Sequence, residues 1–90
     1  MKFDVLVEVQ LLPGISDPQG ATIERALPAL GYDTIGSLRV GRAFRFEVEA
    51  SDDKEAERIS TEVSKKLLAN PVIEQAEVHV TERSGAVVGS

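Results

Sequence analysis

Few residues of this sequence have side chains that could do chemistry, and they are scattered along the chain. His79 is the only histidine and cysteine is absent, so a zinc site, which needs three or four clustered ligands, is not expected. We interpret His79 as a surface residue on the outward face of a strand. The serines have no histidine near them in sequence, and a catalytic triad would have to recruit His79 across the fold. The sequence therefore predicts no catalytic residue, no cofactor-binding residue and no metal ligand.

Binding of a cation, a phosphate or a nucleic acid is not favoured either. The acids Glu47, Glu49, Asp52 and Asp53 lack the spacing and the glycine of an EF-hand loop, and they fit a strand end followed by a helix cap. The glycines form neither a P-loop nor a dinucleotide-binding pattern. Fifteen acids against ten bases give a net charge of -5, which repels phosphate backbones.

The composition indicates one small globular domain. The chain has 90 residues, of which 42% are apolar and 28% are charged. A chain this short buries a modest core, and association with other chains commonly makes up for this. No apolar run approaches the ~18 residues of a membrane span, and the N-terminus lacks the apolar region of a secretory signal. We expect a cytoplasmic location.

The first half of the chain predicts a strand and a capped helix. Residues 3–11 alternate apolar and polar side chains, which is the pattern of a half-buried strand. Asp17 followed by Pro18 is typical of a helix N-cap and first helical position, and Gly31 is the residue expected just past the helix end. Pro28 should distort the last turn. The predicted buried stripe of this helix is Ile23, Ala26, Leu27 and Leu30.

The second half predicts two strands, a helix and a last strand. Residues 34–40 and 43–50 are nearly contiguous, which favours a hairpin. A capping-box pattern at Asp52 begins a helix that runs to about residue 69, and residues 72–80 form the last strand. The predicted buried stripe of the second helix is Ala56, Ile59, Val63 and Leu67.

The predicted order is β-α-β-β-α-β. It indicates an α+β, ferredoxin-like fold, in which two helices cover one face of a four-stranded antiparallel sheet. Residues 1–81 would form the domain, and residues 82–90, which lose all pattern, a mobile tail. The other sheet face would be either solvated or a mixed-charge contact surface. The residues predicted on this face are Asp4, Leu6, Glu8, Gln10, Arg39, Arg45, Glu47, Glu49, Glu77 and His79.

Several motifs are not fully explained by local structure. Gly20 is a poor helix residue in a first turn, and two explanations stay open: the close approach of another backbone, or simply a loose first turn. Taken in order, the motifs resemble the PurS family, the small subunit of phosphoribosylformylglycinamidine synthase (formylglycinamide ribonucleotide amidotransferase). Besides the opening strand, the matching motifs are Asp17-Pro18-Gln19-Gly20, Leu30-Gly31-Tyr32, Leu38-Arg39-Val40-Gly41 and Leu68-Ala69-Asn70-Pro71-Val72-Ile73-Glu74.

The resemblance implies a non-catalytic subunit of an ATP-dependent ligase complex in purine (IMP) biosynthesis. In that complex the synthetase PurL and the glutaminase PurQ carry the active sites, and PurS brings them together so that ammonia can pass between them. The implied partners are PurL, PurQ and further copies of the chain, as a homodimer or a dimer of dimers, with no nucleic acid and no membrane. The complex would use ATP, Mg and glutamine as ammonia donor, with no cofactor on this chain.

Candidate partner-interface residues follow from the position of these motifs and their expected exposure. Arg42 stands where the family often has lysine after the Arg-Val-Gly element, which keeps the charge but changes the hydrogen-bond geometry. The candidates are Asp17, Gln19, Gly20, Tyr32, Arg39, Gly41, Arg42 and Asn70.

Two other protein classes share the predicted layout. A regulatory domain of the ACT kind would hold a small molecule at a dimer interface near the first strand-helix loop, where Gly14 is compatible. An acylphosphatase would need an arginine in a phosphate-binding loop after the first strand, and residues 13–17 contain none. The ACT-like, small-molecule-binding domain is therefore the alternative function.

Overall fold

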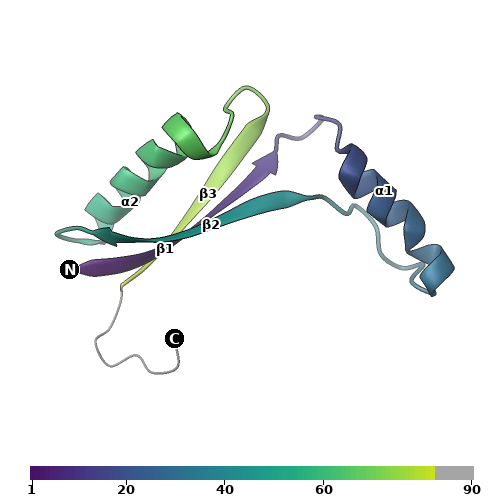
Figure 1. Cartoon of the computed structure of the whole chain (residues 1–90), viewed down its shortest axis with the longest axis horizontal. Coiled ribbons are helices and arrows are strands. Elements are labelled where there is room, and N and C mark those ends of the chain that lie inside the picture. Colours follow the sequence, from purple (N-terminus) through teal and green to yellow (C-terminus); the bar gives the residue numbers. More distant parts are fainter. Residues whose placement is uncertain (83–90) are drawn as a thin grey trace.

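Three strands form one antiparallel sheet in a computed structural model that describes residues 1–82. The strands are β1 (Lys2–Leu11), β2 (Gly41–Glu49) and β3 (Glu74–Glu82), in the order β2-β1-β3. Helix α2 (Asp53–Val63) continues into the short helix η2 (Ser64–Leu68) and lies against one face of the sheet, whereas α1 (Pro18–Ala26) stands beyond one end of it (Figure 1). The short helix η1 (Pro28–Leu30) follows α1.

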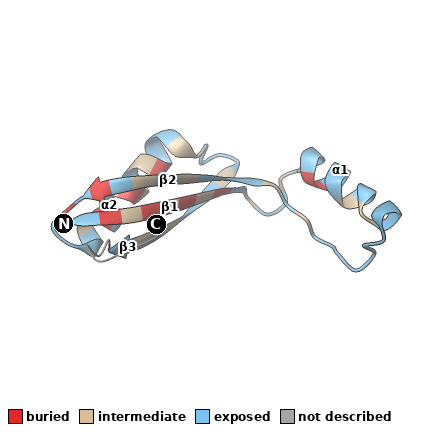
Figure 2. Cartoon of the chain, turned by 60° about the horizontal axis from the view of Figure 1, so that its bottom comes forward, coloured by how far each residue is buried: buried red, intermediate tan, exposed pale blue. Residues whose placement is uncertain are grey.

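The core lies between β1 and α2, as the alternating pattern predicts. Phe3, Val5, Val7 and Val9 are all buried on the inner face of β1 (Figure 2). In the strand register Val5 lies between Phe46 of β2 and Val80 of β3, so the apolar positions of all three strands share one face. The period of two therefore places the core correctly.

Small residues bring α2 close to the sheet. Ala56, Ser60 and Ser64 are spaced four apart and are almost completely buried. The Ser64 hydroxyl donates to the Ser60 carbonyl oxygen at 2.7 Å, which satisfies one of the two buried hydroxyls.

The predicted N-cap of α2 is confirmed, but the predicted buried stripe is wrong at the C-terminal end of the helix. The Asp52 carboxylate accepts from the Glu55 N–H at 2.8 Å, and the Glu55 carboxylate accepts from the Ser51 N–H at 3.1 Å. In η2 the Ala69 N–H donates to the Ser64 carbonyl, five residues back. This wider turn shifts the stripe by one residue, so that Leu67 is 79% exposed and Leu68 packs against the core.

The predictions for the first helix are confirmed at both ends. Asp17 is its N-cap, Pro18 is its first residue, and Gly31 ends η1 with a φ of 94°. The α-helix stops at Ala26, and Pro28 begins a tighter turn of three residues. The expected irregular last turn at this proline is therefore present.

The prediction of a four-stranded sheet with both helices on one face is wrong. Residues 34–40 form no strand, and α1 packs on η1 rather than on a strand. Two side-chain carboxylates accept the N–H groups of Leu38 and Val40, which ties this segment to α1 instead of to a ladder. In addition, Ser37 has a φ of 56°, which interrupts extended backbone.

The three-stranded sheet argues against both alternative protein classes. The ACT-like and acylphosphatase alternatives both depend on a four-stranded layout that residues 1–82 do not form. No helix in the described part of the chain is long and apolar enough to cross a membrane. Apart from Glu82, the predicted mobile tail lies outside the described residues.

Candidate subunit interface

The first unusual feature is an arm, which we define as residues 18–40. It comprises α1, η1 and an extended return segment that runs back beside α1. Asp17 fixes both ends of the arm, because one carboxylate oxygen accepts from the Gly20 N–H and the other from the Val40 N–H, each at 2.9 Å. Glu24 adds a third tie by accepting from the Leu38 N–H at 2.7 Å. The arm is thus organised by two acids, Asp17 just before it and Glu24 within it.

Gly20 is required by the close packing inside the arm. A Cβ atom at this position would lie 2.6 Å from an Asp17 carboxylate oxygen and 2.9 Å from the Leu38 carbonyl oxygen. Both distances are shorter than real Cβ contacts. Of the two explanations for Gly20, the close approach of a backbone is therefore confirmed over a loose first turn, and the approaching backbone belongs to the same chain.

The charge of Asp17 is stabilised by the groups it ties together. The hydrogen bonds from the Val40 and Gly20 N–H groups, with a smaller contribution from Arg39, hold the pKa of Asp17 below its ordinary value of 3.8. Because the pKa is depressed in the folded arm, the contribution of Asp17 to stability is fully present above pH 3.8. It is lost as the pH falls through the lowered pKa.

Replacing Asp17 by asparagine should release the return segment while keeping the helix cap. The amide oxygen can still accept from the Gly20 N–H, but the amide nitrogen cannot accept from the Val40 N–H. We expect the Val40 amide to lose protection from hydrogen exchange, with little change at Gly20. Asp33→Asn, at an exposed position of the same arm, is the matched control. Equal protection of Val40 in both variants would contradict this role of Asp17.

The arm carries large apolar side chains that nothing in the described chain covers. One side of the helical part is covered by the return segment, residues 32–40. Gly20 is buried on this side, and Glu24 and Leu27 are partly buried. The neighbouring stripe is open: Leu30 is 69% exposed and Ile23 is 42% exposed, although both were predicted to be buried in the core. Tyr32 and Ile35 of the return segment are also exposed, at 56% and 48%. An apolar surface of this kind on a small protein is typical of a contact with another chain.

A second cluster connects the start of β2 with the start of β3. The Arg42 guanidinium donates to both oxygens of Glu74, at 2.8 and 2.9 Å, and also to the Leu68 carbonyl at 3.3 Å. Glu74 accepts in addition from the Asn70 N–H at 2.8 Å. The guanidinium lies 5.7 Å from the centre of the Phe44 ring. Two motifs that are distant in sequence thus meet here, across the central strand β1.

The predicted interface residues divide into two groups. Asp17, Gly20 and Arg42 have structural roles within the chain, as described above. Gly41 joins this group, because a Cβ atom there would lie 2.7 Å from the Val9 carbonyl oxygen. The second group is exposed, and its members are Gln19, Tyr32, Arg39 and Asn70. Two of these four also have contacts within the chain, because Arg39 lies 3.6 Å from the Asp17 carboxylate and Asn70 caps the turn before β3. Among the described contacts, the side chains of Gln19 and Tyr32 have no such intrachain partner.

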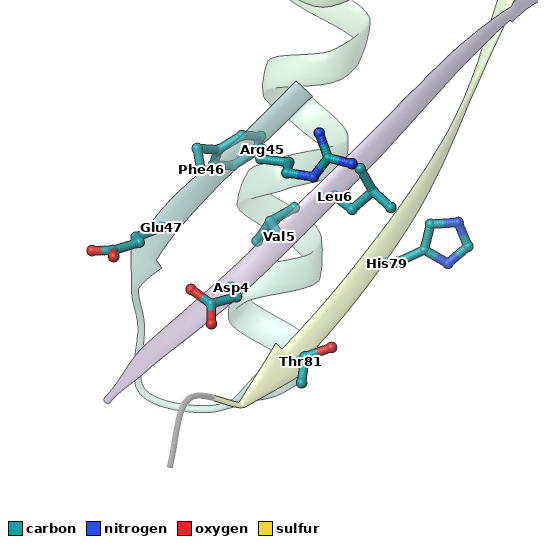
Figure 3. A pocket seen from close by; sticks show the side chains of 8 residues that line it. All are labelled: Asp4, Val5, Leu6, Arg45, Phe46, Glu47, His79 and Thr81. Carbon is teal, nitrogen blue, oxygen red and sulfur yellow. The ribbon is translucent and has the colours of Figure 1, made fainter. Parts of the chain in front are cut away.

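The outer face of the sheet carries both signs of charge around one apolar residue. Within residues 1–82 no helix covers this face (Figures 1 and 2). Leu6 lies in register between Arg45 of β2 and His79 of β3, at a hollow of about 510 Å³ that Asp4 and Thr81 also line (Figure 3). Apart from Arg39, which lies in the arm, the residues predicted on this face are on it.

One cluster on the outer face was missed by reasoning from sequence. The Nε2 atom of His79 lies 2.9 Å from an oxygen of Glu8 and 3.3 Å from an oxygen of Glu77. Glu8 and Glu77 are direct cross-strand partners, and His79 lies two residues further along β3 on the same face. His79 was interpreted as an isolated surface residue, because Glu8 is 71 positions away and the register was not known.

Known proteins provide an independent comparison. Residues 4–82 match the PurS family, described as phosphoribosylformylglycinamidine (FGAM) synthase. The PurS subunit of that synthase from Archaeoglobus fulgidus is 39% identical over 69 residues, which cover 77% of this chain and 86% of the relative.

Solved structures agree. A chain in the structure of PurLQS from Thermotoga maritima is 35% identical, with a TM-score of 0.82 over 89% of this chain and 98% of that one. Methanocaldococcus jannaschii PurS, described as a subunit of formylglycinamide ribonucleotide amidotransferase in the purine biosynthetic pathway, also has a TM-score of 0.82. Its identity is 29%, over 91% of this chain and 99% of that one.

A small α+β chain with a self-organised arm and an uncovered apolar stripe is typical of a subunit of a larger assembly. The comparisons specify which assembly. This chain belongs to the PurS family of phosphoribosylformylglycinamidine synthase subunits, which act in purine biosynthesis as part of a ligase.

Proposed function

We propose that this chain is a non-catalytic assembly subunit, which holds the glutaminase PurQ and the synthetase PurL together so that ammonia can pass between their sites. The observation that carries the proposal is the arm, whose apolar stripe is exposed although its backbone is tied in place. The relative in the Thermotoga maritima PurLQS structure, which shares the fold, supports the choice of partners. A preorganised arm would bind a partner with little loss of conformational entropy.

Self-association is the second part of the proposal. Phe44 and Phe46 lie on the inner face of β2, where they are only partly buried because α2 lies mainly over β3 and β1. This surface and the stripe of Ile23 and Leu30 are both apolar and both incompletely covered within one chain. Contact between the arm of one copy and the sheet of another would bury both. The chain would then form a homodimer, or a dimer of such dimers.

The chemistry belongs to the partners in this proposal. PurL would bind ATP and Mg²⁺, and PurQ would release ammonia from glutamine. This chain contributes position rather than reacting groups, and no cofactor on it takes part in the reaction. Its effect on rate would therefore come from the proximity of the two active sites.

Complex formation tests the assembly role directly. We expect PurL, PurQ and this chain from the same organism to elute together from a size-exclusion column when glutamine and Mg-ATP are present. PurL and PurQ without the chain should elute separately under the same conditions. Co-elution of PurL and PurQ to the same extent without the chain would count against the proposal.

A further inference from the structure

The cluster of Glu8, Glu77 and His79 brings three metal-ligand groups to one point of the outer sheet face. Their nearest ligand atoms all lie within 4.8 Å of one another. The two closest separations, both from His79 Nε2, are 2.9 and 3.3 Å. A tetrahedral zinc ion with ligand bonds of about 2.0–2.1 Å requires its ligand atoms to be about 3.3 Å apart. The side chains of His79 and Glu8 are each 44% exposed and that of Glu77 is 69% exposed, which leaves them room to rotate toward this geometry.

The strands present these groups on a rigid frame. Glu8 stands at the middle of the central strand, and Glu77 and His79 come from the neighbouring strand in fixed register. Two carboxylates directly opposite each other on one sheet face destabilise the pair through repulsion of like charges. A bound cation would remove this repulsion. The pairing of Glu8 with Glu77 would then stabilise the strand pair instead of destabilising it.

We propose that Glu8, Glu77 and His79 bind one divalent transition-metal ion, for which zinc is the best fit. One imidazole nitrogen and two carboxylate oxygens match the ligands that zinc takes in proteins. Three protein ligands on an exposed surface leave the fourth position to water. The ion joins β1 to β3 and neutralises two negative charges on the outer face. This site is independent of the arm and of the assembly function proposed above.

Zinc binding to the untagged, chelator-treated full chain tests the proposal. His79 is the only histidine, so its ring nitrogens give a single set of NMR signals that report on this site alone. We expect calorimetry to show saturable binding of one zinc ion per chain and the Nε2 signal of His79 to shift with the same stoichiometry. Saturating zinc should also raise Tm, because the ion binds the folded chain.

Three variants decide whether these residues form the site. Glu8→Gln and His79→Gln should each weaken zinc binding by at least about 10-fold, since even loss of a supporting partner costs that much at metal sites. Glu49→Gln removes an exposed carboxylate from the same sheet face and should leave the affinity unchanged. Circular dichroism verifies that each variant is folded.

Several results would overturn the proposal. The first is the absence of saturable binding, in which case the His79 ring alone links the two carboxylates. The second is equal affinity in all three variants, which would indicate adventitious binding elsewhere. The third is a stoichiometry of one ion per two chains, which would indicate a bridge between copies instead of a site within one chain.

Discussion

Replacing Leu30 by glutamate should convert the self-associated protein to monomers while the sheet stays folded. Leu30 is 69% exposed and takes no part in the core, so the change costs the isolated chain little. Burying one leucine side chain contributes about 1.5–3 kcal/mol, and a symmetric dimer buries two. The dimer should therefore weaken by at least about 100-fold, as measured by sedimentation equilibrium over a range of concentrations.

Arg25→Glu is the matched control for this experiment. It introduces the same side chain in the same arm, on α1 and at an exposed position outside the apolar stripe. We expect it to change the dissociation constant far less than Leu30→Glu. If both variants behave alike, or if the wild-type chain is a monomer at every concentration, the arm is not the self-association surface.

Replacing Glu74 by glutamine should lower the free energy of unfolding by about 1–2 kcal/mol, after allowance for the exposure of Arg42. The side chain of Glu74 is only 16% exposed and accepts from both Arg42 and the Asn70 N–H. Glutamine keeps one accepting oxygen, so Nη2 of Arg42 loses one of its two carboxylate acceptors and the charge that strengthens both bonds. For a domain of this size Tm should fall by about 4 °C or more, which a thermal melt can measure.

Glu62→Gln provides the comparison, because Glu62 also pairs with an arginine. That pair joins exposed side chains four residues apart on α2, with a separation of 3.4 Å, and should contribute little. Equal Tm values for the two variants would show that the Arg42–Glu74 pair is only a surface contact. A larger fall in Tm for Glu74→Gln than for Glu62→Gln would confirm that the contact between Arg42 and Glu74 stabilises the fold.

The elements with strong local signals were predictable from the sequence. The alternation of residues 3–11 fixes which side of β1 is buried, and Asp17 and Asp52 mark the starts of both helices. Pro28 correctly signals the irregular end of the first helix. Each of these features depends on neighbours within a few residues, and local backbone chemistry decides them.

The missing fourth strand was not predictable from the same signals. Within residues 34–40 only Leu38 and Val40 keep the period of two that suits a strand, and Gly36 already weakened the prediction. Its amide groups are instead accepted by Glu24 and Asp17, which lie 14 and 23 positions earlier in the chain. Nothing in the segment itself indicates that side chains from α1 would compete with a sheet ladder.

The candidate interface shows a similar division. The motifs were proposed as partner contacts, but Gly20, Gly41 and Arg42 have structural roles within the chain itself. Ile23 and Leu30 were predicted to be buried in the core, but they form an exposed stripe. An amphipathic pattern shows that one helix face is apolar, and it does not show whether the same chain or another chain covers that face. The Glu8–Glu77–His79 cluster required the strand register, which one sequence does not supply.

The most direct test of the central claim is a reconstituted synthesis assay with PurL and PurQ from the same organism. Synthesis is followed with glutamine or with free ammonia as the nitrogen source, without this chain, with the wild-type chain and with Leu30→Glu. We expect glutamine-dependent synthesis to require the wild-type chain and to fall with the variant, while free ammonia bypasses much of the requirement. Equal rates with and without the chain from both nitrogen sources would contradict an assembly role.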